Sequence, residues 1–152
     1  MKLFQMHFHR HTLRSLLIGT GFLWHAFFSL FGALLGGKIY AARQIHNTIW
    51  LNSLEAYFLK QLHSHMNTMS FTLILIGLTL FPSRKSPLWQ TLSICFVLCA
   101  LPLFALGLIG QALDLGSGAL IFSSLGGFLY VTGLLIWGAC HVYRCSSTYI
   151  HR

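Results

Sequence analysis

The chain has 152 residues, of which 55% are hydrophobic and only 8% are charged, whereas soluble domains carry roughly 25% charged residues. This composition leaves too little polar surface for a water-soluble fold and favours a single integral membrane domain over residues 1–152. The formal net charge of +8 raises the alternative of a nucleic-acid partner. Because the basic residues stand in loops and tails between apolar runs, we expect contacts with the anionic lipid bilayer and no nucleic-acid binding.

Four continuous apolar runs each approach or exceed the ~20 residues that cross about 30 Å of hydrocarbon. They lack alternation, which favours helices over barrel strands. The first run is longer than a signal-peptide core and ends without a clear cleavage site, so we expect it to be retained. The sequence therefore predicts an all-α four-transmembrane-helix bundle with spans over residues 15–37, 61–81, 88–113 and 118–142.

The connections between these spans differ in length. Residues 82–87 and 114–118 are short polar turns, so the last three spans should be consecutive antiparallel neighbours. The longer connection, residues 38–60, mixes apolar and polar residues at a spacing that predicts an interfacial helix between the first two spans, with Trp50 and Tyr57 at headgroup level. The alternative is that this segment runs straight into the second span.

The distribution of basic residues predicts the orientation in the membrane. With four spans, both ends and the second connection lie on one side. Seven basic residues belong to that side and three to the other: Lys2, Arg10, Arg14, Arg84, Lys85, Arg144 and Arg152 against Lys38, Arg43 and Lys60. Because cytoplasmic loops carry an excess of Lys and Arg, we expect a multi-pass protein with both termini cytoplasmic.

The sequence HSHMN, at residues 63–67, opens the second predicted span. Imidazole and carboxamide groups are costly at membrane depth and usually line a site, a pore or a helix contact. On a helix His63, Asn67 and Ser70 share one face, while His65 points roughly 200° away, since each residue turns about 100°. Two interpretations stay open: a cofactor or substrate site centred on His63, or two interfacial histidines with an interhelical Asn contact.

Other intramembrane polar groups are weaker candidates. His25 lies near the middle of the first span, where a neutral imidazole must find a partner. It is either the opposite side of the same site or a core histidine bonded within the helices. Gln90, Gln111 and Tyr130 either line the same cavity or lie at helix ends.

Small residues predict close helix contacts, either within the chain or with a partner. They are Gly32 and Gly36 in the first span, Gly107 and Gly110 in the third, and Ser123, Gly126, Gly127 and Gly133 in the fourth. The four cysteines are Cys95, Cys99, Cys140 and Cys145. Their spacing is not that of a disulfide framework, so we expect structural packing residues.

Three short motifs resemble known families. His63-x-His65-x-Asn67 followed by Ser70-Phe71 resembles small four-helix bacterial membrane proteins related to the haem-bearing subunit I of haem–copper oxidases. The same region is similar to styrene-oxide isomerase and hydroxylaminobenzene mutase, four-helix membrane proteins with a histidine near the start of the second helix. Leu103-Phe104 with residues 124–127 resembles the end of an uncharacterised four-helix inner-membrane family.

The first two resemblances imply a haem site. His63 would be the axial ligand of the iron of haem b, with Asn67 beside it. From their places in the first two spans we expect His25 and His65 as further contacts, with His25 on the opposite side of the site. The expected function is then that of an inner-membrane protein that binds haem and acts on or senses a small lipophilic molecule, by isomerase or redox chemistry in the case of an enzyme. The alternative is a non-catalytic membrane subunit or scaffold that packs with a partner, or with a second copy of itself, through its Gly-rich helix faces.

Overall fold

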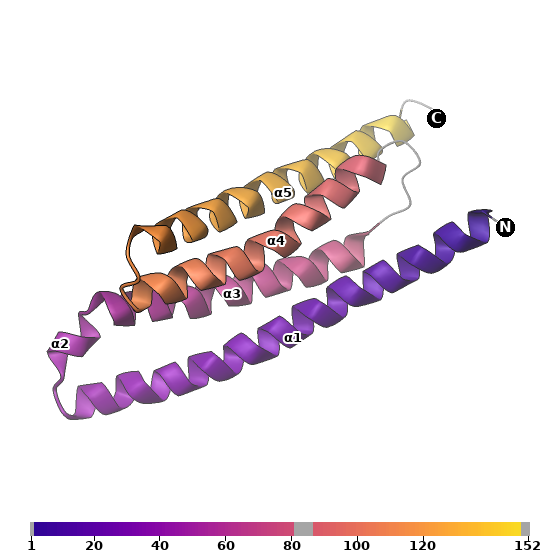
Figure 1. Ribbon diagram of the computed structural model, residues 1–152. Helices are drawn as coiled ribbons and strands as arrows, with labels where there is room; N and C mark the ends of the chain where they lie inside the picture. The colour runs from indigo at the N-terminus through magenta and orange to yellow at the C-terminus, as the bar shows by residue number, and fades with distance from the viewer. Residues whose placement is uncertain (1, 81–86, 150–152) are drawn as a thin grey trace.

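The computed structural model describes the backbone of residues 2–80 and 87–149 and the side chains of residues 12–80 and 88–143. Within these residues every regular element is a helix, which confirms the all-α prediction. The helices are α1 (Lys2–Gln44), α2 (Thr48–Leu51), α3 (Leu54–Thr79), α4 (Pro87–Ala112) and α5 (Ser117–Tyr149) (Figure 1).

The four long helices pack in chain order: α1 lies along α3, α3 along α4, and α4 along α5, each antiparallel to the next (Figure 1). The start of α1 and the end of α5 lie at one end of this row, which we call the terminal end. The turn from α4 to α5 and the helix α2 lie at the other, the α2 end. The predicted antiparallel order of the last three long helices is thus confirmed.

Within residues 12–80 and 88–143, three helices are long and apolar enough to cross a membrane, over Thr12–Gln44, Leu88–Ala112 and Ser117–Tyr143. The chain is therefore a membrane protein by the length and composition of its helices. With 26 residues, α3 is also long enough, but it is not among these three. The imidazole and amide groups of residues 63–67 lower the hydropathy of its first half.

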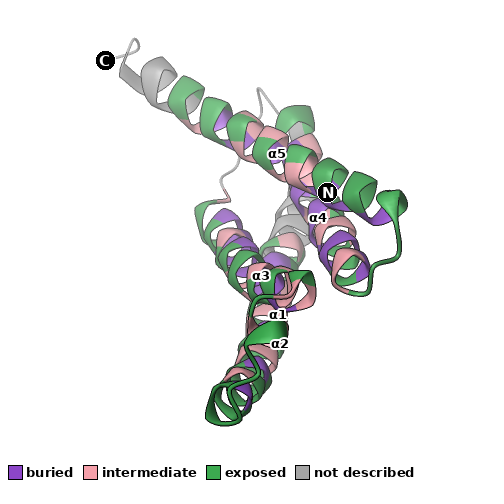
Figure 2. Cartoon of the chain, turned by 90° about the vertical axis from the view of Figure 1, so that its left-hand side faces the viewer, coloured by how far each residue is buried: buried purple, intermediate pink, exposed green. Residues whose placement is uncertain are grey.

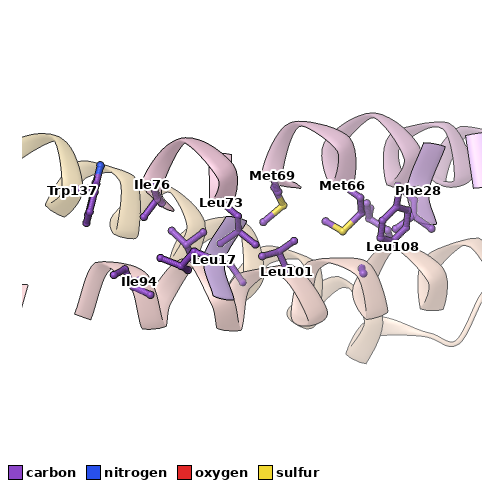
Figure 3. Packing of buried hydrophobic residues seen from close by; sticks show 14 residues of the cluster. Leu17, Phe28, Met66, Met69, Leu73, Ile76, Ile94, Leu101, Leu108 and Trp137 are labelled. Carbon is purple, nitrogen blue, oxygen red and sulfur yellow. The ribbon is translucent and has the colours of Figure 1, made fainter. Parts of the chain in front are cut away.

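Two neighbouring faces of α3 carry most of its buried residues. One face packs on α4, where Met66, Met69 and Leu73 meet Leu101 and Leu108 (Figure 3). The other face packs on α1, where Gly77 of α3 lies against Ile18. Figure 2 shows exposed residues along the outer helices α1 and α5 and buried residues between neighbouring helices. Helix α3 therefore has protein on two faces, as does α4, which packs on α3 and α5.

Small residues bring α4 and α5 into close contact. A Cβ atom at Gly107 would collide with the backbone of Ser123, and one at Gly126 would meet the backbone of Phe104. Ser93 is fully buried and donates a hydrogen bond from its hydroxyl to the carbonyl oxygen of Gly133 at 2.7 Å. These small residues of the third and fourth predicted spans therefore serve contacts within the chain.

The corner between α1 and α3 replaces the predicted interfacial helix by a single turn, α2. Asn47 caps α2 by accepting a hydrogen bond from the Trp50 amide at 3.1 Å, and Ser53 caps α3 by accepting one from the Ala56 amide at 3.2 Å. From Leu54 onwards the connection is part of α3. The alternative, a segment that runs straight into the second predicted span, describes residues 54–60 better, because α3 begins after its N-cap Ser53 and continues without a break to Thr79.

An ion pair ties this corner together. Lys38 Nζ lies 2.8 Å from Glu55 Oε1, and it also stands over the ring of Trp50 at 4.3 Å from the centroid. The hydrogen bond from Lys38 holds the pKa of Glu55 below its ordinary value.

Candidate functional site

The side chain of His63 points from α3 into the contact with α1. Its Nδ1 lies 2.8 Å from the carbonyl oxygen of Phe28. A carbonyl oxygen can only accept, so Nδ1 carries the hydrogen and donates it. In the neutral imidazole the lone pair is then on Nε2, the ring nitrogen that can act as a base or as a metal ligand.

Gly32 makes this approach possible. A Cβ atom at residue 32 would overlap the imidazole ring of His63. Gly32 lies one helical turn after Phe28, so the ring rests on the bare backbone beside the carbonyl to which it donates. Of the predicted Gly32 and Gly36 pair only Gly32 has this role, because a Cβ atom at Gly36 would meet nothing within 4 Å.

Asn67 and Ser29 extend this polar contact. We call the contact between α1 and α3 at residues 28, 29, 32, 63 and 67 the seam. The amide nitrogen of Asn67 lies 3.1 Å from Nδ1 of His63, and the hydroxyl of Ser29 lies 3.5 Å from the Asn67 oxygen. Because Nδ1 carries a hydrogen, it is better matched by the oxygen of Asn67 than by the amide nitrogen. In the flipped amide the Asn67 oxygen faces Nδ1–H and the Asn67 nitrogen faces the hydroxyl of Ser29. The predicted shared face of His63 and Asn67 is confirmed, since both side chains meet α1.

The structure places the other two predicted haem contacts against different neighbours. His25 packs its ring on Phe71 of α3, with centroids 4.4 Å apart, and its Nδ1 is buried without a hydrogen-bond partner. His65 is exposed and its ring stands edge-on to Phe104 of α4 at 5.3 Å. His63 and His65 therefore face different helices, as their spacing predicts. Among the side chains that the structure describes, no three His, Cys, Asp or Glu residues gather as a metal site.

Gln111 and Tyr130 bond to neighbouring helices. Nε2 of Gln111 donates to the hydroxyl of Ser123 at 2.6 Å, and the hydroxyls of Tyr130 and Thr72 are 2.6 Å apart. The second bond links α5 to α3. Both groups thus stabilise contacts between helices of this chain.

Sequence reasoning missed two members of the site. Ser29 stands one turn after His25, so its place on the same helix face is visible in the sequence, but its partner is not. The Phe28 carbonyl carries no sequence signal, because every residue has one. Near Phe28, the glycine at residue 32 is the sequence feature that allows another helix to approach the backbone closely.

A cavity of about 340 Å³ lies away from this seam, between α4 and α5 near the terminal end. It is lined by Trp89, Ile136, Ala139, Cys140 and Tyr143. Cys140 is buried, in keeping with a packing role, whereas Cys95 and Cys99 are exposed.

One feature of the seam can be compared with known haem-ligating histidines, namely the hydrogen bond made by the second ring nitrogen. Metal-ligating histidines usually donate their second ring N–H to a carbonyl or carboxylate, which fixes the tautomer and the ring orientation. His63 makes such a bond with its Nδ1, and Asn67 lies next to it. His63 thus makes the hydrogen bond through its second ring nitrogen that a metal-ligating histidine usually makes.

A comparison of the chain with protein-family models, with curated proteins and with solved structures finds no significant match. The likeness to haem-bearing four-helix proteins stays a prediction from the short motifs.

Proposed function

We propose that α3 is a fourth membrane span and that the chain crosses the bacterial inner membrane with both termini in the cytoplasm. Its 26 residues extend over ~39 Å at about 1.5 Å per residue, more than the hydrocarbon core requires. Its polar groups at His63 and Asn67 bond toward α1 rather than into lipid. The excess of basic residues at the terminal end supports the orientation.

Cysteine labelling tests this arrangement. In a chain whose native cysteines are replaced by alanine, we expect a membrane-impermeant thiol reagent applied to intact cells to label His46→Cys and Leu115→Cys. It should leave Ser83→Cys unlabelled until the membrane is permeabilised. Labelling of Ser83→Cys in intact cells would place residues 46 and 83 on the same side, and α3 would not be a span.

The function that the site supports best is haem binding through Nε2 of His63. The observation that carries the proposal is the 2.8 Å hydrogen bond from Nδ1 to the Phe28 carbonyl, because it leaves the lone pair on Nε2. The His-x-His-x-Asn motif is a second support. Haem b held there would supply Lewis-acid or one-electron chemistry, which suits an isomerase or redox protein for a small lipophilic molecule that enters from the bilayer.

The residues of the seam would have distinct tasks. The Phe28 carbonyl orients the ring and increases the basicity of Nε2 through the hydrogen bond. Asn67 and Ser29 restrain the ring from the side, and Gly32 leaves room for it. Aromatic side chains around residue 28, with Trp24 stacked on Phe28 at 5.4 Å, exclude water from the seam.

Absorption spectroscopy of the detergent-purified protein, before and after titration with haemin, tests this function. We expect a Soret band in the wild type and its loss in His63→Ala. His65→Ala is the matched control, since His65 is exposed on another face, and it should keep the band. A wild type that stays colourless after titration, or a His63→Ala variant that binds haemin as tightly as the wild type, would overturn the proposal.

The second candidate is a membrane subunit or scaffold that packs with a partner or with a second copy. Cβ atoms at Gly19, Gly36 and Gly37 of α1 would meet nothing within 4 Å, so α1 keeps small residues that the chain itself leaves unused. Gly36→Leu should then abolish an oligomer seen by chemical cross-linking in membranes, while haemin binding is absent from the start. Loss of the oligomer in a colourless protein would favour this candidate over haem binding.

A further inference from the structure

The cavity between α4 and α5 lies near the start of α4 and toward the end of α5. Trp89 is the third residue of α4, and Tyr143 lies six residues before the end of α5 at Tyr149. Both line the cavity and both are more than half exposed. Trp and Tyr favour the boundary between hydrocarbon and headgroups, so we infer that the cavity lies near that boundary.

The lining of the cavity suits hydrocarbon. Ile136, Ala139 and Cys140 present carbon and sulfur atoms, and the aromatic rings of Trp89 and Tyr143 complete the wall. The volume of about 340 Å³ is within the range of roughly 300–1,000 Å³ found for small-molecule sites. A flexible acyl chain can fill such a space without leaving a polar group unpaired.

Charge indicates which lipid would supply that chain. Arg144 follows Tyr143 directly in α5. In the sequence, seven of the ten Lys and Arg residues belong to the amino-terminal segment, the connection between α3 and α4, and the carboxyl-terminal segment. A basic surface at headgroup level attracts anionic lipids.

We propose that this cavity binds one acyl chain of an anionic phospholipid whose phosphate lies at the level of residue 144. The site is independent of the His63 seam, because it lies between a different pair of helices. The shape of the cavity would hold this lipid at one position, and the basic residues would select an anionic headgroup. The lipids that surround any membrane helix are neither fixed nor selected in this way.

Native mass spectrometry of the full-length, detergent-purified protein tests the proposal. The protein is incubated with equal amounts of phosphatidylglycerol and phosphatidylcholine that carry identical acyl chains. We expect one phosphatidylglycerol to be retained with about fivefold preference, as one basic residue at an anionic surface provides. Ala139→Phe fills the cavity and should remove the bound lipid. Leu135→Phe adds a ring to an exposed position of the same helix outside the lining and should not.

The remaining outcomes also decide the matter. Equal retention of both lipids, or retention of phosphatidylglycerol by Ala139→Phe, would overturn the proposal. If circular dichroism shows that Ala139→Phe is unfolded, Arg144→Gln and Tyr143→Leu take its place, and unchanged lipid preference in both would overturn it. Displacement of the lipid by glycerol phosphate would show that the site recognises a soluble phosphate instead of an acyl chain. None of these outcomes depends on haem.

Discussion

The helix pairs α4–α5 and α1–α3 both bring two apolar helices into close contact, but they use different side chains. In α4–α5, glycines and serines let the backbones come into contact, the buried hydroxyl of Ser93 donates to the facing carbonyl of Gly133, and Gln111 donates to Ser123. In α1–α3, glycines also bring the helices together, but an imidazole is placed between them at Gly32. Glycines and serines thus bring α4 and α5 together, whereas the α1–α3 contact adds an imidazole that donates a hydrogen bond to the facing backbone.

The largest expected effect is on the α4–α5 contact. Gly107→Val should destabilise the protein at the upper end of the about 1–3 kcal/mol typical of overpacking, because the added atoms meet the backbone of Ser123. SDS titration followed by circular dichroism measures the free energy of unfolding. Gly138→Val is the control, since its surroundings are open. Equal stability of the two variants would contradict the close contact.

A smaller effect is expected in the α1–α3 seam. Gly32→Ala should displace the ring of His63 and break its hydrogen bond, which is worth about 0.5–1.5 kcal/mol. Alanine also favours helix by up to about 1 kcal/mol over glycine, so Gly36→Ala, which faces open space, is measured beside it. The difference between the two free energies of unfolding is the effect of the ring. A difference of zero would mean that the seam does not depend on His63.

The contact of α3 with α5 allows a sharper test. Thr72→Val and Tyr130→Phe each remove one hydroxyl of the 2.6 Å pair. In a double-mutant cycle we expect a coupling free energy of about 0.6 kcal/mol, the average for hydrogen bonds between membrane helices. Strict additivity of the two single effects would show that the hydroxyls do not bond in the folded protein.

The smallest effect concerns the corner at the α2 end. The hydrogen bond from Lys38 lowers the pKa of Glu55 from its ordinary value of 4.5. The ionised carboxylate therefore contributes stability above that value, and the contribution disappears as the pH falls through the lowered pKa of the folded state. Thermal unfolding between neutral and acidic pH should reveal this loss in the wild type and a flatter profile in Glu55→Gln. An identical pH profile in both proteins would contradict the ion pair.

Apolar run length was enough to predict the helices and their order. The predicted spans fall inside or close to α1, α3, α4 and α5, and the short turn after α4 is confirmed by the positive φ angles of Asp114 and Gly116, 56° and 80°. The ends were less predictable. Helix α1 continues to Gln44, beyond the predicted end at residue 37, because a helix need not stop where the hydrocarbon does.

The seam was predictable only in part. Helical spacing places His63 and Asn67 on one face, and that face does meet α1. Which helix would meet it, and that a backbone carbonyl would accept the hydrogen bond, depend on tertiary packing. Gln111 was harder still, since a polar residue near a helix end is equally compatible with solvent, a cavity or a neighbouring hydroxyl. The structure pairs it with Ser123.

The polarity of the first half of α3 has a consequence for biogenesis. A segment with two imidazoles and an amide partitions poorly into hydrocarbon on its own. For α3 to cross the bilayer, α1 must already be present to accept its hydrogen bonds, so the two segments should leave the insertion machinery as one hairpin. A nascent chain that ends before α3 would anchor α1 alone, whereas α3 without α1 would stay at the surface or be degraded.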